Sequence, residues 1–361
     1  MFYVFQSYHK TDIVNFDAVL KDKSTIRLNS MIFLSKKCIF ILFSLLLIMF
    51  IDINNLFGQN NRNRPLLASR SNDYISFSVD GIDRQYILYI PTGYESKSIP
   101  LIIVLHGTYG TGRKMRALGF DTYADKYGFA VAYPDAYITE DTNPTARWND
   151  GRGTLKSSEL GIDDVYFIKM MIAHINKSIT IDKSRIYVTG ASNGGIMAYR
   201  LALEASDLFA AVAPVIANIP EPIYGKIVPS SKISILTING TDDPFVPFNG
   251  GEVCSDVRNS FCEKGYVVSY EKSINIFVQS NGCSNNPISN RLEPIVEDGT
   301  WVEKREFQGC LNNCEVVSYI VHGGGHTWPP HRGQLNQAGK PTGNLDATKE
   351  IVNFFLRHTK Q

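Results

Sequence analysis

The sequence has 361 residues, of which 44% are hydrophobic and 20% charged, and its formal net charge is +1. This is the composition of a globular protein, and it lacks the excess of positive charge that nucleic-acid-binding domains carry. From about residue 74 onward, the chain is long enough for one α/β domain with a substantial core.

The N-terminal part of the chain predicts export. Lys36 and Lys37 precede a run of fourteen residues with one serine and no charge, which Asp52 ends. A membrane-spanning helix needs about 20 such residues, so a secretory signal peptide over residues 31–58 fits better than an anchor. An uncleaved anchor is the alternative. Residues 1–30, with their aspartates, are unlike the beginning of a signal peptide, so we interpret Met31 as the true start and residues 1–30 as an over-long start or a disordered segment.

Residues 59–73 are polar and predict a disordered linker, which precedes a catalytic domain over residues 74–361. Within this domain, apolar runs alternate with helical patterns. Strands are expected at residues 85–90, 101–106, 128–134, 185–190, 209–215, 233–238 and 316–321, and helices at 164–175, from 194, at 272–280 and up to 358. Such alternation predicts a mainly parallel sheet with helices on both faces.

Ser192 lies between a predicted strand and a predicted helix, in the stretch YVTGASNGG. In a nucleophile elbow, a tight turn at this place lifts a serine hydroxyl above the edge of the sheet. Gly190 and Gly194 give the backbone the freedom that such a turn needs. The alternative is an ordinary serine in a glycine-rich connection.

A nucleophilic serine needs a histidine as base and a carboxylate that orients it, and in this fold type the order is Ser, Asp or Glu, His. Asp242 and Asp243 follow one predicted strand, and His326 follows the last strand after three glycines. In parallel sheets, catalytic and binding residues lie at the carboxyl ends of the strands. The two aspartates could also be plain turn formers. His322 competes with His326, which we favour because His322 still belongs to the strand.

The expected oxyanion hole consists of two backbone N–H groups. One belongs to Asn193, directly after the serine, and the other to Thr108 in the loop LHGTYG. A phosphate-binding loop is excluded because no Lys-Ser or Lys-Thr pair follows these glycines. Asp163 and Asp164 could suggest a metal, but an N-cap on the following helix is the expected role.

Seven collinear motifs carry a resemblance to a known family: LHGTYG, AYPDA, RWNDG, GIDDVYFI, RIYVTGASNGGIMAYRLA, NGTDDPFVPFNGG and GGGHTWP. From roughly Ser76 to its end, the chain resembles the secreted polyhydroxybutyrate depolymerase and feruloyl esterase family of α/β-hydrolases. The resemblance implies that fold, with Ser192 as nucleophile, His326 as base and Asp243 as acid. The family's aspartate directly precedes a proline, which selects Asp243 over its neighbour.

One position departs from the family pattern, because Asn239 stands before Gly240 where the family usually has histidine. This position lies outside the expected triad and puts little in doubt.

Five cysteines follow the signal segment, so at least one stays unpaired within a monomer. Cys254 with Cys262 would close a short loop, and the family pattern suggests Cys283 with Cys310. A zinc site is disfavoured because paired Cys-x-x-Cys spacing and a nearby histidine are lacking.

The sequence therefore predicts a secreted serine esterase that needs no cofactor or metal and acts on feruloyl or acetyl esters of plant polysaccharide. Its partner is an ester substrate, with no nucleic acid and no stable membrane anchor. Trp148 and Trp328 are expected to line the cleft, with burial in the core as the alternative. Rival functions are a polyhydroxybutyrate depolymerase, a prolyl-oligopeptidase-type peptidase, for whose extra domain the chain has no room, and a non-catalytic carbohydrate-binding module.

Overall fold

A computed structural model describes residues 73–94, 98–138, 146–256, 261–330 and 338–360. These residues belong to a single compact unit. The predictions made for residues 1–72 lie outside the described residues. No helix within the described ranges is long and apolar enough to cross a membrane.

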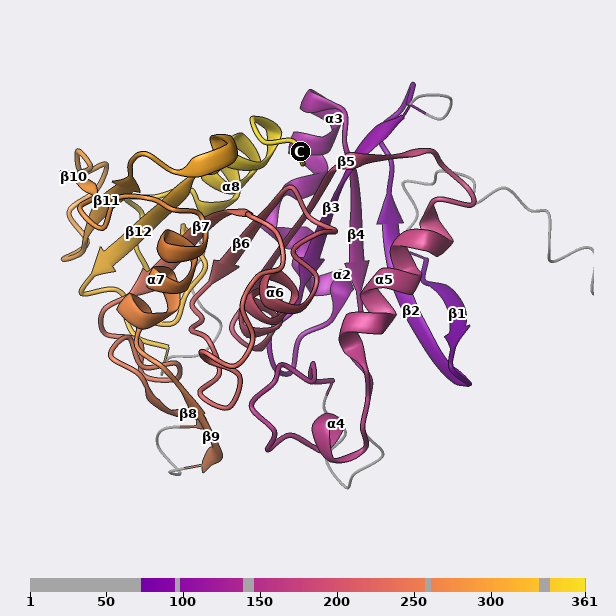
Figure 1. The fold of residues 1–361 in the computed structure, drawn as a ribbon, viewed down its shortest axis with the longest axis horizontal. Coiled ribbons are helices and arrows are strands. Elements are labelled where there is room, and N and C mark those ends of the chain that lie inside the picture. The colour runs from indigo at the N-terminus through magenta and orange to yellow at the C-terminus, as the bar shows by residue number, and fades with distance from the viewer. Residues whose placement is uncertain (1–72, 95–97, 139–145, 257–260, 331–337, 361) are drawn as a thin grey trace, which may run out of the picture. The chain divides into compact units, whose positions relative to one another are not determined.

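A ten-stranded sheet forms the centre of this unit (Figure 1). Its strand order is β1-β2-β4-β3-β5-β6-β7-β12-β11-β10, and β8 and β9 form a separate hairpin. The run from β4 to β12 is parallel, and the strands beyond its two ends pair antiparallel. The strands are β1 (Ile75–Val79), β2 (Ile82–Tyr89), β3 (Ile99–Leu105), β4 (Ala130–Pro134), β5 (Ile181–Ala191), β6 (Ala211–Val215), β7 (Ser234–Gly240), β8 (Gly251–Asp256), β9 (Phe261–Val267), β10 (Ile288–Arg291), β11 (Trp301–Phe307) and β12 (Val316–His322).

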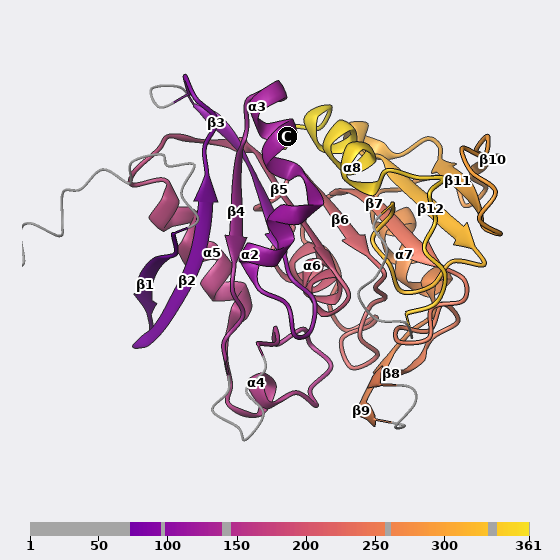
Figure 2. The ribbon, with the colours of Figure 1, turned by 180° about the vertical axis from the view of Figure 1, so that it is seen from behind.

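Helices cover both faces of the sheet, so the expected architecture is confirmed (Figures 1 and 2). One core contains side chains of α5, α6 and α7, and the core on the opposite face contains side chains of α2, α3 and α8. Because the central strands are buried on both faces, they consist of continuous apolar runs such as IPLIIVL in β3. The helices are α2 (Gly112–Met115), α3 (Phe120–Tyr127), α4 (Lys156–Glu159), α5 (Asp164–Ile175), α6 (Asn193–Glu204), α7 (Tyr270–Ser280) and α8 (Ala347–Leu356), and short 3-10 turns lie at Arg116–Leu118 and Leu311–Asn313.

The acidic pair before α5 has a structural role. The Asp163 side chain accepts a hydrogen bond from the backbone N–H of Tyr166, which confirms the predicted N-cap. Asp164 is buried and pairs with Arg84 at 2.6 Å. In the part of the chain that the structure describes, no three His, Cys, Asp or Glu side chains gather as a metal site would require.

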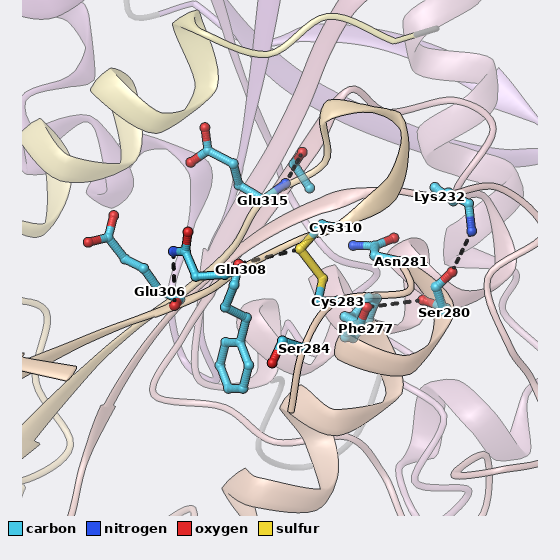
Figure 3. The surroundings of a disulfide bond; sticks show 12 residues. Lys232, Phe277, Ser280, Asn281, Cys283, Ser284, Glu306, Gln308, Cys310 and Glu315 are labelled. Carbon is cyan, nitrogen blue, oxygen red and sulfur yellow. Dashed lines mark hydrogen bonds between the residues drawn. A yellow bond between two sulfur atoms is a disulfide. The ribbon is translucent and has the colours of Figure 1, made fainter. Parts of the chain in front are cut away.

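Both expected disulfides are confirmed. Cys254 is joined to Cys262 across the β8–β9 hairpin. Figure 3 shows the second bond, in which Cys283, just after α7, is joined to Cys310 in the segment between β11 and β12. Cys314 is left as a partly buried free thiol.

Candidate active site

Ser192 occupies the turn between β5 and α6 in a strained conformation. Its φ is 57° and its ψ is −124°, in a region that side chains larger than glycine rarely adopt and that costs about 1–3 kcal/mol. The backbone N–H of Ser192 donates to the carbonyl of Val215 at 3.0 Å, which fixes the turn to the end of β6. The strand, turn and helix expected around this serine are confirmed.

The two glycines of the motif are required by close packing. A Cβ atom on Gly190 would lie 2.5 Å from the carbonyl oxygen of Gly194, and one on Gly194 would lie 2.5 Å from the carbonyl oxygens of Leu105 and His106. Any side chain at either position would therefore push the elbow away from the end of β3.

Asp243 and His326 form a hydrogen-bonded pair. Asp243 follows β7, His326 follows β12, and the distance from Asp243 Oδ2 to His326 Nδ1 is 2.7 Å. Asp243 Oδ1 accepts hydrogen bonds from the backbone N–H groups of Phe245 at 2.8 Å and Val246 at 2.9 Å. A carboxylate only accepts, so Nδ1 of His326 carries the proton of the neutral ring and Nε2 is left able to accept one.

The neighbouring candidates have other partners. Asp242 is exposed, and its carboxylate accepts a hydrogen bond from the Thr241 hydroxyl at 2.8 Å. His322 lies 3.0 Å from the carboxylate of Glu303, and its ring stacks on Trp301 with a centroid distance of 3.7 Å. The geometry thus pairs Asp243 with His326 and leaves both competitors outside this pair.

Sheet topology brings the serine and this pair to one edge. Because β5, β6, β7 and β12 are adjacent and parallel, their carboxyl ends lie at the same edge of the sheet. The loops after β7 and β12 are tied by a hydrogen bond from Asp242 N to Gly324 O at 2.9 Å. No hydrogen bond joins Ser192 Oγ to His326 Nε2 in the described structure. Such contacts are often long in free enzymes and tighten when substrate binds.

The loop after β3 lies against the elbow. A Cβ atom on Gly107 would lie 3.3 Å from Ser192 Cβ and 3.1 Å from the carbonyl oxygen of Ala191. Among the described residues, the backbone N–H groups of Thr108 and Asn193 have no hydrogen-bond partner. Asn193 is also the first residue of α6, where the positive end of the helix dipole lies. Two backbone N–H groups are therefore available as donors near the serine, one in the loop after β3 and one at the start of α6.

His106 stabilises that loop from inside the protein. Its Nε2 accepts from the backbone N–H of Ala136 at 3.0 Å, so its Nδ1 carries the proton and donates to the carbonyl of Gly107 at 2.8 Å. Burial lowers the pKa of His106, which favours this neutral form. We therefore interpret His106 as a structural residue of the loop.

The expectation that Trp148 and Trp328 line the cleft is not supported by their positions. Trp148 is fully buried, and its indole N–H donates to the carbonyl of His106 at 2.9 Å. Trp328 is 6% exposed, and its indole N–H donates to the Thr348 hydroxyl at 3.0 Å between the sheet and α8. Both indole N–H groups found partners in the interior, which is the alternative that the sequence left open.

The third tryptophan lies at the edge that carries the candidate triad, and sequence reasoning missed it. Trp301 is partly exposed and pairs across β11 and β12 with His322, four residues before His326. The guanidinium of Arg291 lies 5.0 Å from the centre of its ring. The sequence offers little signal for this strand, because WVEKREF contains four consecutive charged residues and lacks the apolar–polar alternation of a half-buried strand.

Comparison with known proteins finds esterases. The family model described as "Esterase PHB depolymerase" matches residues 84–234, which include Ser192 but end before Asp243 and His326. The chain is 29% identical over 287 residues to a protein named "Putative esterase NocK" from Nocardia uniformis subsp. tsuyamanensis, a match that covers 77% of this chain and 80% of that one. It is 28% identical over 249 residues to feruloyl esterase C of Emericella nidulans, with 68% and 77% coverage.

Among solved structures, an acetyl xylan esterase from Aspergillus awamori superimposes with a TM-score of 0.51 at 15% identity, over 78% of this chain and 99% of that one. This likeness shows the fold alone, and that fold is the α/β-hydrolase fold. The family model and the matched relatives show that the chain is a carboxylic ester hydrolase, and they make it similar to the polyhydroxybutyrate depolymerase and feruloyl esterase family.

Proposed function

We propose that this protein is a secreted serine esterase that hydrolyses feruloyl or acetyl esters of plant polysaccharide with Ser192, His326 and Asp243 as its catalytic triad. The hydrogen bond of 2.7 Å between Asp243 and His326 carries the proposal, because it lies at the sheet edge where the strained Ser192 turn also lies. In this geometry, the carboxylate orients the imidazole of the catalytic base and stabilises its protonated form.

In this mechanism, Ser192 Oγ attacks the ester carbonyl while His326 Nε2 takes its proton. Asp243 stabilises the imidazolium that results. The negative charge on the carbonyl oxygen is bound by the N–H groups of Asn193 and Thr108. His326 then gives its proton to the departing alcohol, and an acyl-enzyme remains. Water attacks this acyl-enzyme with His326 again as base, which releases the acid and restores Ser192. No step requires a cofactor.

Labelling identifies the nucleophile directly. A fluorophosphonate reacts with an activated serine, so mass spectrometry of the labelled protein should find the adduct on the peptide that contains Ser192. The same protein should hydrolyse p-nitrophenyl acetate. An adduct at another serine, or an unlabelled protein without esterase activity, would contradict the proposal.

The substrate class is supported by the relative from Emericella nidulans, which is named a feruloyl esterase. The description of the family model favours a polyhydroxybutyrate depolymerase as the second candidate. A side-by-side measurement of kcat/KM for methyl ferulate, acetylated xylan and a hydroxybutyrate oligomer separates the two. If the oligomer is preferred by tenfold or more, equivalent to about 1.4 kcal/mol of transition-state free energy, the depolymerase proposal replaces ours.

Secretion is supported by the cysteines of the catalytic domain. Two disulfides are formed in the described structure, and such bonds persist in oxidising compartments such as the cell exterior.

A further inference from the structure

The segment Arg147–Gly151 is one of the motifs of the family resemblance, but the reaction described above does not use it. Its tryptophan contacts both segments that supply the proposed oxyanion donors. The indole N–H of Trp148 donates to the carbonyl of His106 in the loop after β3 at 2.9 Å. The backbone of Trp148 binds the side chain of Asn193, the residue directly after the serine.

The contact with Asn193 is reciprocal. Trp148 N donates to Asn193 Oδ1 at 2.8 Å, and Asn193 Nδ2 donates to Trp148 O at 3.1 Å. Asn193 Nδ2 also donates to Asp150 Oδ2 at 2.6 Å, and Asp150 is paired with Arg152 at 2.9 Å. All four residues are at most 2% exposed. Three buried hydrogen bonds thus fix the side chain of the first residue of α6, and with it the direction of the Asn193 backbone N–H.

On the other side, hydrogen bonds fix the orientation of the peptide unit that contains the Thr108 N–H. This unit begins with the carbonyl of Gly107, which accepts from His106 Nδ1 at 2.8 Å and from Gly110 N at 2.9 Å. In a trans peptide the N–H points away from the carbonyl, so these two bonds set the direction of the Thr108 N–H. The preceding carbonyl, that of His106, is the one that Trp148 holds.

We infer that Trp148 is a positioning residue, which joins the two halves of the proposed oxyanion hole into one rigid unit. The inference rests on the proposed function. Such donors accelerate a reaction because they are already aimed at the place where charge develops in the transition state. Trp148 touches neither substrate nor the reacting atoms in this mechanism. Its loss should therefore weaken binding of the transition state much more than binding of the substrate.

The test is Trp148→Phe, which keeps an aromatic ring in the core but removes the indole N–H together with part of the buried ring system. The matched control is Trp328→Phe, which removes one buried indole N–H from the opposite face of the sheet, where it binds Thr348. For each variant, kcat and KM are measured with p-nitrophenyl acetate, thermal unfolding is recorded, and Ki is measured for an aryl trifluoromethyl ketone. This ketone forms a tetrahedral adduct whose oxygen occupies the oxyanion hole.

For Trp148→Phe, we expect kcat to fall by about tenfold or more while KM stays within about twofold of the wild-type value. Removal of a whole oxyanion-hole donor lowers kcat by roughly 10²–10³, and a misaligned donor should cost part of this loss. The Ki of the ketone should rise in proportion to the loss in kcat. Trp328→Phe should keep wild-type kcat and Ki even if both variants unfold at equally lowered temperatures. A wild-type kcat in Trp148→Phe, or equal losses in the two variants, overturns the inference.

If Trp148→Phe does not fold, Asn193→Ala tests the same link from the other side. This variant keeps the backbone N–H donor and removes the three side-chain hydrogen bonds, so kcat and the Ki of the ketone should change in the same way. Wild-type values for both would overturn the inference. A wild-type protein that fails to hydrolyse p-nitrophenyl acetate contradicts the proposed function, whereas an active wild type with unaffected variants contradicts the positioning role alone.

Discussion

Replacement of Asp243 by asparagine should abolish most activity, and the structure gives the reason. Asp243 Oδ1 accepts hydrogen bonds from two backbone N–H groups, those of Phe245 and Val246. In Asp243→Asn, the amide oxygen must stay at these donors, so the NH₂ group turns toward His326 Nδ1. Because Nδ1 must then accept, the neutral ring carries its proton on Nε2 and cannot take the proton of Ser192.

Enforcing the wrong tautomer of a triad histidine lowers kcat by about 10⁴, which corresponds to roughly 5.4 kcal/mol of transition-state stabilisation. The fold should survive, because the two hydrogen bonds to the loop after β7 are kept. The measurement is kcat/KM for p-nitrophenyl acetate, with circular dichroism and thermal unfolding as checks on the fold.

Asp242→Asn is the matched control. This carboxylate is exposed and binds only the Thr241 hydroxyl in the described structure, so the variant should keep activity within about threefold, since surface substitutions change free energies by about 0.5 kcal/mol or less. If Asp242→Asn is the inactive variant, or if Asp243→Asn keeps wild-type turnover, the assignment of the acid is refuted.

Three further outcomes are expected. Ser192→Ala should lose on the order of a thousandfold or more in kcat with an intact fold, and near-normal turnover would refute its role as nucleophile. The exported protein should begin between about residues 56 and 62 by mass spectrometry; a mature chain that retains residues 38–51 would favour an anchor. Arg84→Met should lower the free energy of unfolding by about 3–5 kcal/mol in urea titrations, because it leaves Asp164 buried without its partner. Burial already raises the pKa of Asp164, and this deficit should shrink as pH falls toward the ordinary carboxyl pKa and the group is protonated; a deficit that grows on acidification would contradict this account.

The parts of the site that the sequence predicted well are those with local signals. The Ser192 turn needs two glycines within five residues because β3 leaves no room for a Cβ atom there, and this requirement is visible as a motif. The positions of Asp243 and His326 follow from strand order, since each comes directly after an apolar run that can only be a central strand. Local packing and chain order therefore predicted a serine, an aspartate pair and a histidine at one edge, but only the family resemblance selected Asp243 over Asp242.

The tryptophans show what a local pattern does not contain. An indole serves equally well at a substrate surface and in a core, provided that its N–H finds an acceptor. For Trp148 this acceptor is the carbonyl of His106, more than forty positions earlier in the chain, and for Trp328 it is the hydroxyl of Thr348. These pairings depend on how loops fold over the sheet, so the sequence left burial and exposure equally open.

Edge elements were missed for a related reason. β10 and β11 carry charged residues and pair antiparallel at one end of the sheet, where one face or both are open to solvent. Their apolar content is too low to distinguish them from loops. α3 has the sequence FDTYADKY, in which the two residues that face the core, Phe120 and Ala124, are too few to reveal a helical period.

The departure at Asn239 is compatible with the proposed triad on physical grounds. Asn239 is buried near the end of β7, four residues before Asp243, and its Nδ2 donates to the carbonyl of Ala217 beyond the end of β6 at 2.9 Å. A histidine can place one ring N–H in the same direction, so either residue can connect the two strand ends that flank the site. The carboxylate of Asp243 is fixed by Phe245, Val246 and His326, and none of these three residues forms a hydrogen bond with Asn239 in the described structure. Asn239 connects β6 and β7 through one hydrogen bond, and Asp243 is oriented by others. A substitution at position 239 therefore does not require a change in the orientation of Asp243.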